Sequence, residues 1–288
     1  MVSEEMRGFL SSANQKTRKD TNKSIHQQRA ELDAFMADLE VPAEVDMSDF
    51  KLTGRPARRY TPPGARTDRG ILCFHGGGYR VGSLNAYNSF MSHLAIACEA
   101  PVTGLDYRLA PEHTYPAALD DAVAAFVELS ASMASENIMI IGDSAGGSLT
   151  LSCLLKLKEQ NLPLAGCATL LSANTDFTCS GDSYGKRRAE FKEGLKAYAG
   201  DHPMDTVGLS PLFGDHAGLP PLLIHVASDE SMLDDSTQLQ ERAVAAGVDS
   251  QIQIFDDAFH VFQIFTNIPE AREAIAAIGT FFQKKIGD

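Results

Sequence analysis

Long apolar runs and an excess of positive charge are both missing from this 288-residue sequence. No apolar run reaches the roughly 18 residues that a membrane-spanning helix needs, so we expect no membrane insertion. The formal net charge is -13, and a uniformly acidic chain repels phosphate backbones and polyanionic membrane surfaces. Nucleic acid is therefore not an expected partner.

Cysteine is sparse, and no two cysteines have the C-x-x-C spacing that is typical of metal or redox sites. An H-E-x-x-H motif is also absent, so the sequence predicts no metal and no cofactor. The cysteine count is odd, and most cysteines lie in apolar runs, which favours small core residues over a disulfide framework. The cysteines are Cys73, Cys98, Cys153, Cys167 and Cys179.

Residues 1–20 lack the apolar stretch and the small-residue cleavage site of a signal peptide. Acidic and basic side chains are instead mixed among polar ones. We therefore expect a cytoplasmic protein.

The composition of the whole chain is that of an ordinary globular protein, with 44% hydrophobic and 22% charged residues. Its length suits one large α/β domain. Residues 1–39 have a polar helical pattern, and short strands are predicted at 49–52 and 58–60. Beyond them, predicted strands and helices alternate, which favours a mostly parallel sheet with helices on both faces. The strands are 71–74, 102–107, 137–141, 167–171, 222–227 and 251–255, and the helices are 85–98, 116–130, 146–160, 233–246 and 269–285.

This alternation stops between Asn174 and Leu219, where glycine, aspartate, serine and lysine are more frequent. A helical pattern near Lys186–Tyr198 is the main feature of this stretch. Because the stretch is too long for an ordinary loop, we interpret it as an insertion. Insertions after the carboxyl ends of strands tend to cover an active site.

A glycine-rich turn after a predicted strand carries the most informative motif. The run Gly142-Asp-Ser-Ala-Gly146 fits the pattern G-x-S-x-G, with Ser144 at its centre. A strand precedes it and a helix follows, which is the setting in which a serine is held in a strained, exposed turn as a nucleophile. We therefore predict that Ser144 is a nucleophile. The alternative is a glycine-rich turn into a helix with no chemistry.

A second glycine run, His75-Gly-Gly-Gly78, follows the buried segment Ile71–Phe74. Successive glycines let the backbone approach a ligand and direct N–H groups at it, as the oxyanion of acyl transfer requires. We predict N–H donors at Gly77 and Gly78, with Ala145 as the third. A flexible turn or a phosphate loop is the alternative, but Tyr79 and Arg80 stand where a phosphate loop has Lys and Ser or Thr.

His260 is the best candidate for the base that activates Ser144. It lies in a loop between the last predicted strand and the last predicted helix, where an imidazole can reach the nucleophile. An ordinary loop histidine is the alternative. The acid that orients the imidazole should follow strand 222–227, and composition alone leaves several carboxylates open. They are Asp229, Glu230, Asp234 and Asp235.

From about Arg69 to Phe282 the chain resembles the hormone-sensitive-lipase-like (family IV) carboxylesterases. Several blocks carry this resemblance together and are far more specific than any one of them. They are His75–Gly78, Asp106–Glu112, Tyr115–Asp120, Gly142–Gly147, Ser210–Leu212 and Phe259–Phe262.

The resemblance implies an α/β-hydrolase fold, with a mostly parallel eight-stranded sheet, helices on both faces and a small helical cap. The cap would comprise residues 1–45 and an insertion at about 178–206, and residues 46–288 would form the hydrolase domain. The resemblance also implies Ser144 as nucleophile and His260 as base. It places the acid at Glu230, with Asp229 as the rival because the family has Asp more often at that position.

The activity that the resemblance implies is cofactor-free hydrolysis of short-to-medium acyl esters, with a small-molecule ester as substrate. Lactone opening and deacetylation of a natural product are alternatives for the same site. A non-catalytic ligand receptor is a further alternative, but related receptors lack the histidine that His260 supplies here. Some relatives pair through an edge strand, which leaves open a homodimer through Gln251–Phe255. The apolar side chains Phe9, Leu10, Phe35 and Phe191 are candidates to line an acyl pocket, although packing between helices is the interpretation we favour.

Overall fold

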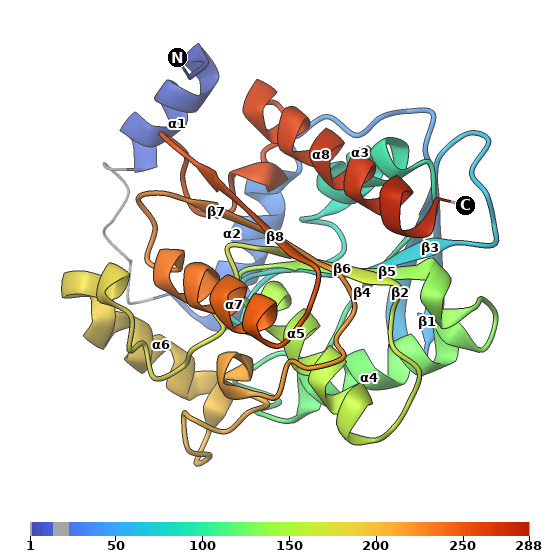
Figure 1. Ribbon diagram of the computed structural model, residues 1–288. Helices are drawn as coiled ribbons and strands as arrows, with labels where there is room; N and C mark the ends of the chain where they lie inside the picture. Colours follow the sequence, from blue (N-terminus) through green and yellow to red (C-terminus); the bar gives the residue numbers. More distant parts are fainter. Residues whose placement is uncertain (1, 14–22, 288) are drawn as a thin grey trace.

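A computed structural model describes residues 2–13 and 23–287 of the chain. Within these residues, eight strands form one sheet in the order β1-β2-β4-β3-β5-β6-β7-β8 (Figure 1). The pairs β1–β2 and β2–β4 are antiparallel, and all pairs from β4 onward are parallel. The strands are β1 Asp46–Leu52, β2 Arg55–Thr61, β3 Gly70–Phe74, β4 Val102–Leu105, β5 Ile138–Asp143, β6 Cys167–Leu171, β7 Leu222–Ala227 and β8 Ser250–Phe255.

Helices connect the parallel strands and cover the sheet on both sides, as the alternating pattern predicts. Helices α3 and α8 pack on one face, and α4, α5 and α7 pack on the other (Figure 1). The helices are α1 Glu4–Ala13, α2 Ile25–Met36, α3 Asn88–Cys98, α4 Ala117–Ser130, α5 Ala145–Glu159, α6 Arg188–Ala199, α7 Leu233–Ala245 and α8 Pro269–Ile286. Short 3₁₀ helices are η1 Ser135–Asn137, η2 Asp182–Arg187, η3 Pro211–Phe213 and η4 Phe262–Ile264.

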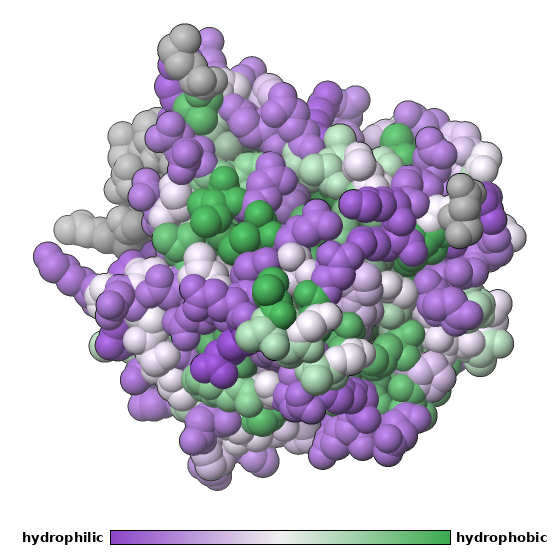
Figure 2. All heavy atoms as spheres, viewed as in Figure 1, coloured by the Kyte–Doolittle hydropathy of each residue, from purple (hydrophilic) through white to green (hydrophobic). Residues whose placement is uncertain are grey.

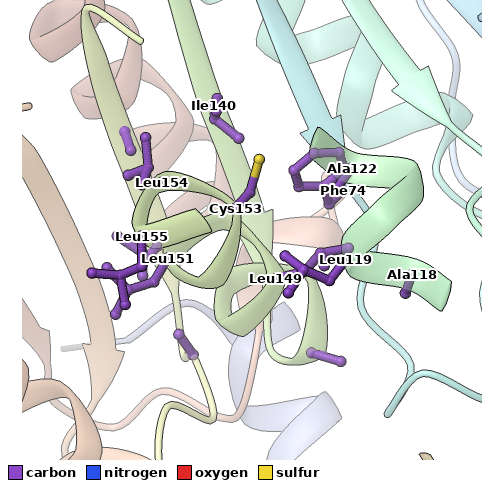
Figure 3. Packing of buried hydrophobic residues seen from close by; sticks show 14 of the residues in the cluster. Phe74, Ala118, Leu119, Ala122, Ile140, Leu149, Leu151, Cys153, Leu154 and Leu155 are labelled. Atoms are coloured by element: carbon purple, nitrogen blue, oxygen red, sulfur yellow. The ribbon is translucent and has the colours of Figure 1, made fainter. Parts of the chain in front are cut away.

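Two large clusters of buried hydrophobic residues lie on the two faces of the sheet. In β5, Ile138 and Ile140 belong to the cluster beneath α4 and α5, whereas Met139 and Ile141 belong to the cluster beneath α3 and α8. Because successive side chains of a strand point to opposite faces, a strand apolar at every position must be covered on both sides. Figure 3 shows the first cluster, in which Cys153 of α5 lies close to Ile140.

The free cysteines are all buried, as the sequence predicts. On the face of the molecule in Figure 2, hydrophilic side chains predominate and hydrophobic ones gather in separate small patches. No helix within residues 2–13 and 23–287 is long and apolar enough to cross a membrane.

One strand is shorter than predicted, because β4 ends at Leu105 and the predicted strand extends to Tyr107. The pairing with β2 ends where Leu105 lies opposite Ala57. Beyond that point the Tyr107 ring packs at the centre of the molecule, and its hydroxyl donates to the carbonyl of His75 at 2.6 Å. This tyrosine therefore supports the glycine run instead of extending the strand.

Candidate active site

Ser144 occupies a tight turn between β5 and α5, as predicted. Its backbone has φ 50° and ψ -115°, a conformation that non-glycine residues rarely adopt. The Ser144 N–H donates to the carbonyl of Leu171 at the end of β6, at 2.7 Å. The neighbouring strand thus stabilises the strained turn and holds the serine at the carboxyl edge of the sheet.

The two glycines of the motif are required by backbone contacts across this turn. A Cβ atom on Gly142 would lie 2.2 Å from the carbonyl oxygen of Gly146. A Cβ atom on Gly146 would lie 2.0 Å from the carbonyl oxygen of Phe74, at the end of β3. Helix α5 therefore begins in direct contact with the strand that leads into the glycine run, and only glycine fits there.

We expect Gly146→Ala to lower the free energy of unfolding by about 3 kcal/mol, because the new methyl group meets backbone that cannot rotate away. Urea denaturation of both proteins measures this difference. Gly194→Ala is a matched control, since a Cβ atom there meets nothing within 4 Å and alanine favours the helix. Equal stability of Gly146→Ala and the wild type would contradict the close packing of α5 on β3.

His260 lies in the loop that follows β8, as predicted, and contacts both other members of the predicted triad. Its Nε2 atom is 3.0 Å from Ser144 Oγ. Its Nδ1 atom hydrogen-bonds to Glu230 Oε2. The loop is held in place by Ser172 at the end of β6, whose hydroxyl accepts from the Val261 N–H at 3.4 Å. The imidazole is 42% exposed and is accessible to a ligand.

Glu230 lies just beyond β7 and is buried. Its Oε1 atom accepts from the Ser172 hydroxyl at 2.6 Å and from the Ala227 N–H at 2.8 Å. These two bonds orient the carboxylate so that Oε2 faces His260. The sequence did not single out Ser172, because its role depends on β6 and β7 being neighbours in the sheet.

The other carboxylates near Glu230 face elsewhere. Asp229 is exposed to solvent. Asp234 accepts from the Ser183 N–H at 2.9 Å, and Asp235 is buried and accepts from the Tyr184 hydroxyl at 3.0 Å. Burial raises the pKa of Asp235 to about 8. Of the four carboxylates that composition leaves open, the structure places Glu230 against His260.

Opposing effects act on the pKa of His260. Partial desolvation by the surrounding protein lowers this pKa, because it disfavours the charged imidazolium. The charge of Glu230 and its hydrogen bond raise it, with a smaller contribution from Asp143, and the net pKa lies above the ordinary value of 6.5. The imidazole therefore takes up a proton readily, as a general base must.

The glycine run lies beside the serine. Gly77 and Gly78 have φ values of 110° and 61°, which place both in the region that glycine tolerates. Together with Ser144 and Ala145 they line one cavity. In residues 2–13 and 23–287, no protein acceptor is bonded to the N–H groups of Gly77, Gly78 and Ala145. The start of α5 adds a positive helix-dipole end at this point.

Asp143 connects the two glycine motifs, and sequence reasoning missed this role. Its buried carboxylate accepts from the Gly76 N–H at 2.9 Å and from the Tyr87 hydroxyl at 2.8 Å. Burial raises the pKa of Asp143 to about 6. The position next to Ser144 is visible in the sequence, but its two partners, 67 and 56 residues away, are not.

The cavity has a volume of about 200 Å³. Helix α6 contributes Phe191 and Leu195 to its wall, and α2 contributes Gln28. Of the apolar residues considered for an acyl pocket, Phe191 lines the cavity, whereas Phe35 packs edge-on against Phe265 away from it. The side chains of Phe9 and Leu10 lie outside the residues that the structure describes.

Two charged residues of the Asp106–Glu112 block form ion pairs away from the serine. Arg108 pairs with Asp121 at 2.8 Å, and Glu112 pairs with Arg29 of α2 at 2.7 Å. The second pair ties α2 to the loop that follows β4. His225 lies buried within β7.

Known proteins resemble this chain in both sequence and fold. Residues 71–264 match a family described as having the α/β-hydrolase fold. An acetyl-hydrolase of Streptomyces hygroscopicus is 33% identical over 255 residues, which are 85% of each chain. An esterase of Acinetobacter venetianus is 35% identical over 223 residues, or 73% of each chain.

Among solved structures, an esterase from the bacterial hormone-sensitive lipase family superposes with a TM-score of 0.94 at 34% identity. The match covers 99% of both chains. The similarity in sequence and fold covers most of the chain and is not confined to the serine motif. The chain therefore belongs to the hormone-sensitive-lipase-like carboxylesterases of the α/β-hydrolase fold.

Proposed function

We propose that this protein is a serine carboxylesterase that cleaves short-to-medium acyl esters through an acyl-enzyme on Ser144. The observation that carries the proposal is the continuous contact from Glu230 to His260 and from His260 Nε2 to Ser144 Oγ at 3.0 Å. This contact ends at Ser144 in the cavity that Gly77 and Gly78 also line. Nucleophile and proposed oxyanion donors thus line one space, and the base contacts the nucleophile, as acyl transfer requires.

In the first step, Ser144 Oγ bonds to the ester carbonyl carbon while His260 Nε2 takes the hydroxyl proton. The N–H groups of Gly77, Gly78 and Ala145 stabilise the negative oxygen of the tetrahedral intermediate. The intermediate collapses when the bond to the alcohol oxygen breaks, and His260 returns the proton to that oxygen. Glu230 keeps the imidazole in the required tautomer and stabilises the imidazolium.

In the second step, water bonds to the acyl carbon and gives one proton to His260. The bond between the acyl carbon and Ser144 Oγ then breaks, and the proton returns to the serine. The products are a carboxylic acid, an alcohol and the free enzyme. Every proton and bond in the two steps is accounted for by Ser144, His260, the ester and one water molecule.

We further propose that α2 and α6 act as a cap over this site. Both helices line the cavity, and the Tyr198 ring of α6 stacks on Tyr79 beside the glycine run at 3.8 Å. A cap in this position sets the length of the acyl group, because Phe191 and Leu195 close one wall. The cytoplasmic location and the homodimer through β8 stay predictions.

The proposal is tested by hydrolysis of p-nitrophenyl esters from acetate to palmitate. We expect the highest kcat/KM on the shorter chains, since about 200 Å³ does not enclose a palmitoyl chain. A fluorophosphonate should label the protein at Ser144 to one equivalent. A folded protein that hydrolyses none of these esters and resists the label would refute the esterase and favour a receptor.

Deacetylation is a second candidate function. The relative from Streptomyces hygroscopicus is named an acetyl-hydrolase, and it matches 85% of this chain. The same triad and donors serve acetyl transfer to water. A kcat/KM that falls steeply from acetate to butyrate would favour this candidate over a broader esterase.

A further inference from the structure

The cation Arg80 lines the cavity of the candidate active site, and neither the proposed catalytic steps nor the family resemblance gives its side chain a role. It follows the glycine run in the loop between β3 and α3. Its backbone is fixed on both sides, because its N–H donates to the Gly77 carbonyl at 3.0 Å and its carbonyl accepts from Arg29 Nε at 2.8 Å. The base of the side chain is thus held beside the predicted oxyanion donors.

The guanidinium of Arg80 has no protein counter-ion in the part of the chain that the structure describes. Its Nε atom is buried and has no hydrogen-bond acceptor there. A buried guanidinium N–H without an acceptor is unfavourable, and in native proteins such a group calls for an explanation. The two Nη atoms are not buried in this way and have no acceptor among the described residues, so they are the donors that a ligand can reach.

The other charges of the cavity wall largely offset each other. Arg187 and Glu190 both line the cavity, and Arg187 Nε lies 3.9 Å from Glu190 Oε2. The Arg187 guanidinium also stacks on the Phe191 ring at 4.8 Å. Among the cavity-lining residues that the structure describes, Arg80 is therefore the positive charge without an anionic partner, although the chain as a whole carries a net charge of -13.

We propose that Arg80 binds a carboxylate of the substrate, so that the site is adapted to esters that carry a free carboxylate, such as monoesters of dicarboxylic acids. The planar fork of an arginine matches a carboxylate with two parallel hydrogen bonds. The reacting carbonyl lies at Ser144 while the distant carboxylate lies at Arg80, across the same small cavity. This inference rests on the proposed esterase function and adds a substrate class to it.

The test compares monoethyl succinate, glutarate and adipate with ethyl butyrate, pentanoate and hexanoate, which have the same acyl carbon counts and no carboxylate. Acid release in a pH-stat gives kcat/KM for each matched pair. Salt at about 0.15 M screens the electrostatic effect of the protein's net charge on the ester beyond about 8 Å. The direct contact proposed between Arg80 and the carboxylate persists. The measured quantity is the ratio of the anionic to the neutral ester.

We expect Arg80→Gln to lower this ratio by about tenfold to a hundredfold for the best-fitting chain length, as the loss of a charged hydrogen bond predicts. Arg66→Gln removes the same charge from an exposed pair with Asp68 and should leave the ratio unchanged. The inference is wrong if Arg80→Gln and Arg66→Gln give the same ratio. Failure of the esterase proposal has a different signature, because the wild type would then hydrolyse neither ester.

A binding measurement separates recognition from catalysis. In Ser144→Ala protein, isothermal titration with monoethyl glutarate should give a dissociation constant at least about tenfold lower than in the Ser144→Ala/Arg80→Gln double variant. This comparison does not depend on turnover, and circular dichroism verifies that both proteins are folded. Equal dissociation constants would overturn the assignment of Arg80.

Discussion

Ser144→Ala should lower kcat on p-nitrophenyl butyrate by about 10⁴-fold or more, the range expected when a nucleophile that acts together with a base is removed. The cause is the loss of Ser144 Oγ, the proposed attacking atom, which lies 3.0 Å from His260 Nε2. Alanine retains the backbone bond from residue 144 to Leu171, so the fold should persist. Initial rates at saturating ester measure the change.

Ser152→Ala is the matched control for this experiment. Ser152 lies in α5, is buried and donates to the Gly208 carbonyl at 3.1 Å, away from the cavity. It should retain the wild-type kcat. If Ser144→Ala kept most of its activity and still unfolded at the wild-type temperature, the acyl-enzyme mechanism would be refuted.

Replacing Glu230 with glutamine should lower kcat by about 10³- to 10⁴-fold and also shift the pH dependence. The glutamine side chain has the size of glutamate but carries no charge. The substitution removes the two contributions of Glu230 that raise the pKa of His260, and it leaves the smaller one from Asp143 and the desolvation that lowers this pKa. The pKa of the imidazole should therefore fall.

The direction of the pH shift follows from the proposed role of His260. The base is active when neutral, so the rate falls as pH drops through the pKa of His260, which in the wild type lies above 6.5. In Glu230→Gln the acid limb should move to lower pH while the plateau drops. A pH profile of kcat/KM and an NMR titration of the His260 ring measure the same shift independently.

Asp229→Asn decides between the two carboxylates that the family resemblance leaves open. Asp229 is exposed, so its replacement should change neither the rate nor the pKa of His260. A large loss in Asp229→Asn with a small loss in Glu230→Gln would reverse the assignment of the acid.

Much of the fold follows from local sequence patterns. The apolar runs of β3, β5, β6 and β7 are buried at every position, and each is too short for a helix. Their alternation with amphipathic helices predicts a parallel sheet covered on both faces, and the sheet has that form. The predicted end of β4 was less accurate. Tyr107 fits the apolar pattern of a strand, but it packs against His75 beyond the end of β4.

The predicted site shows the same division. G-x-S-x-G and the run of three glycines are each contiguous in the sequence, so the roles of Ser144, Gly77 and Gly78 were predicted from it directly. His260 was predicted from its place after the last strand, and the acid was narrowed to Glu230 or Asp229 by resemblance. Local sequence carries the chemistry of each side chain and the turn that presents it.

Only the tertiary structure shows which carboxylate faces the imidazole and what holds it there. Glu230 and Asp229 are adjacent and chemically alike, but one is oriented by Ser172 and Ala227 and the other points to solvent. The tie from Asp143 to Gly76 and the buried Nε of Arg80, which has no acceptor within residues 2–13 and 23–287, likewise depend on how distant segments pack. Strand order and burial decide such contacts, because they set the orientation of each side chain. No local sequence pattern encodes either of them.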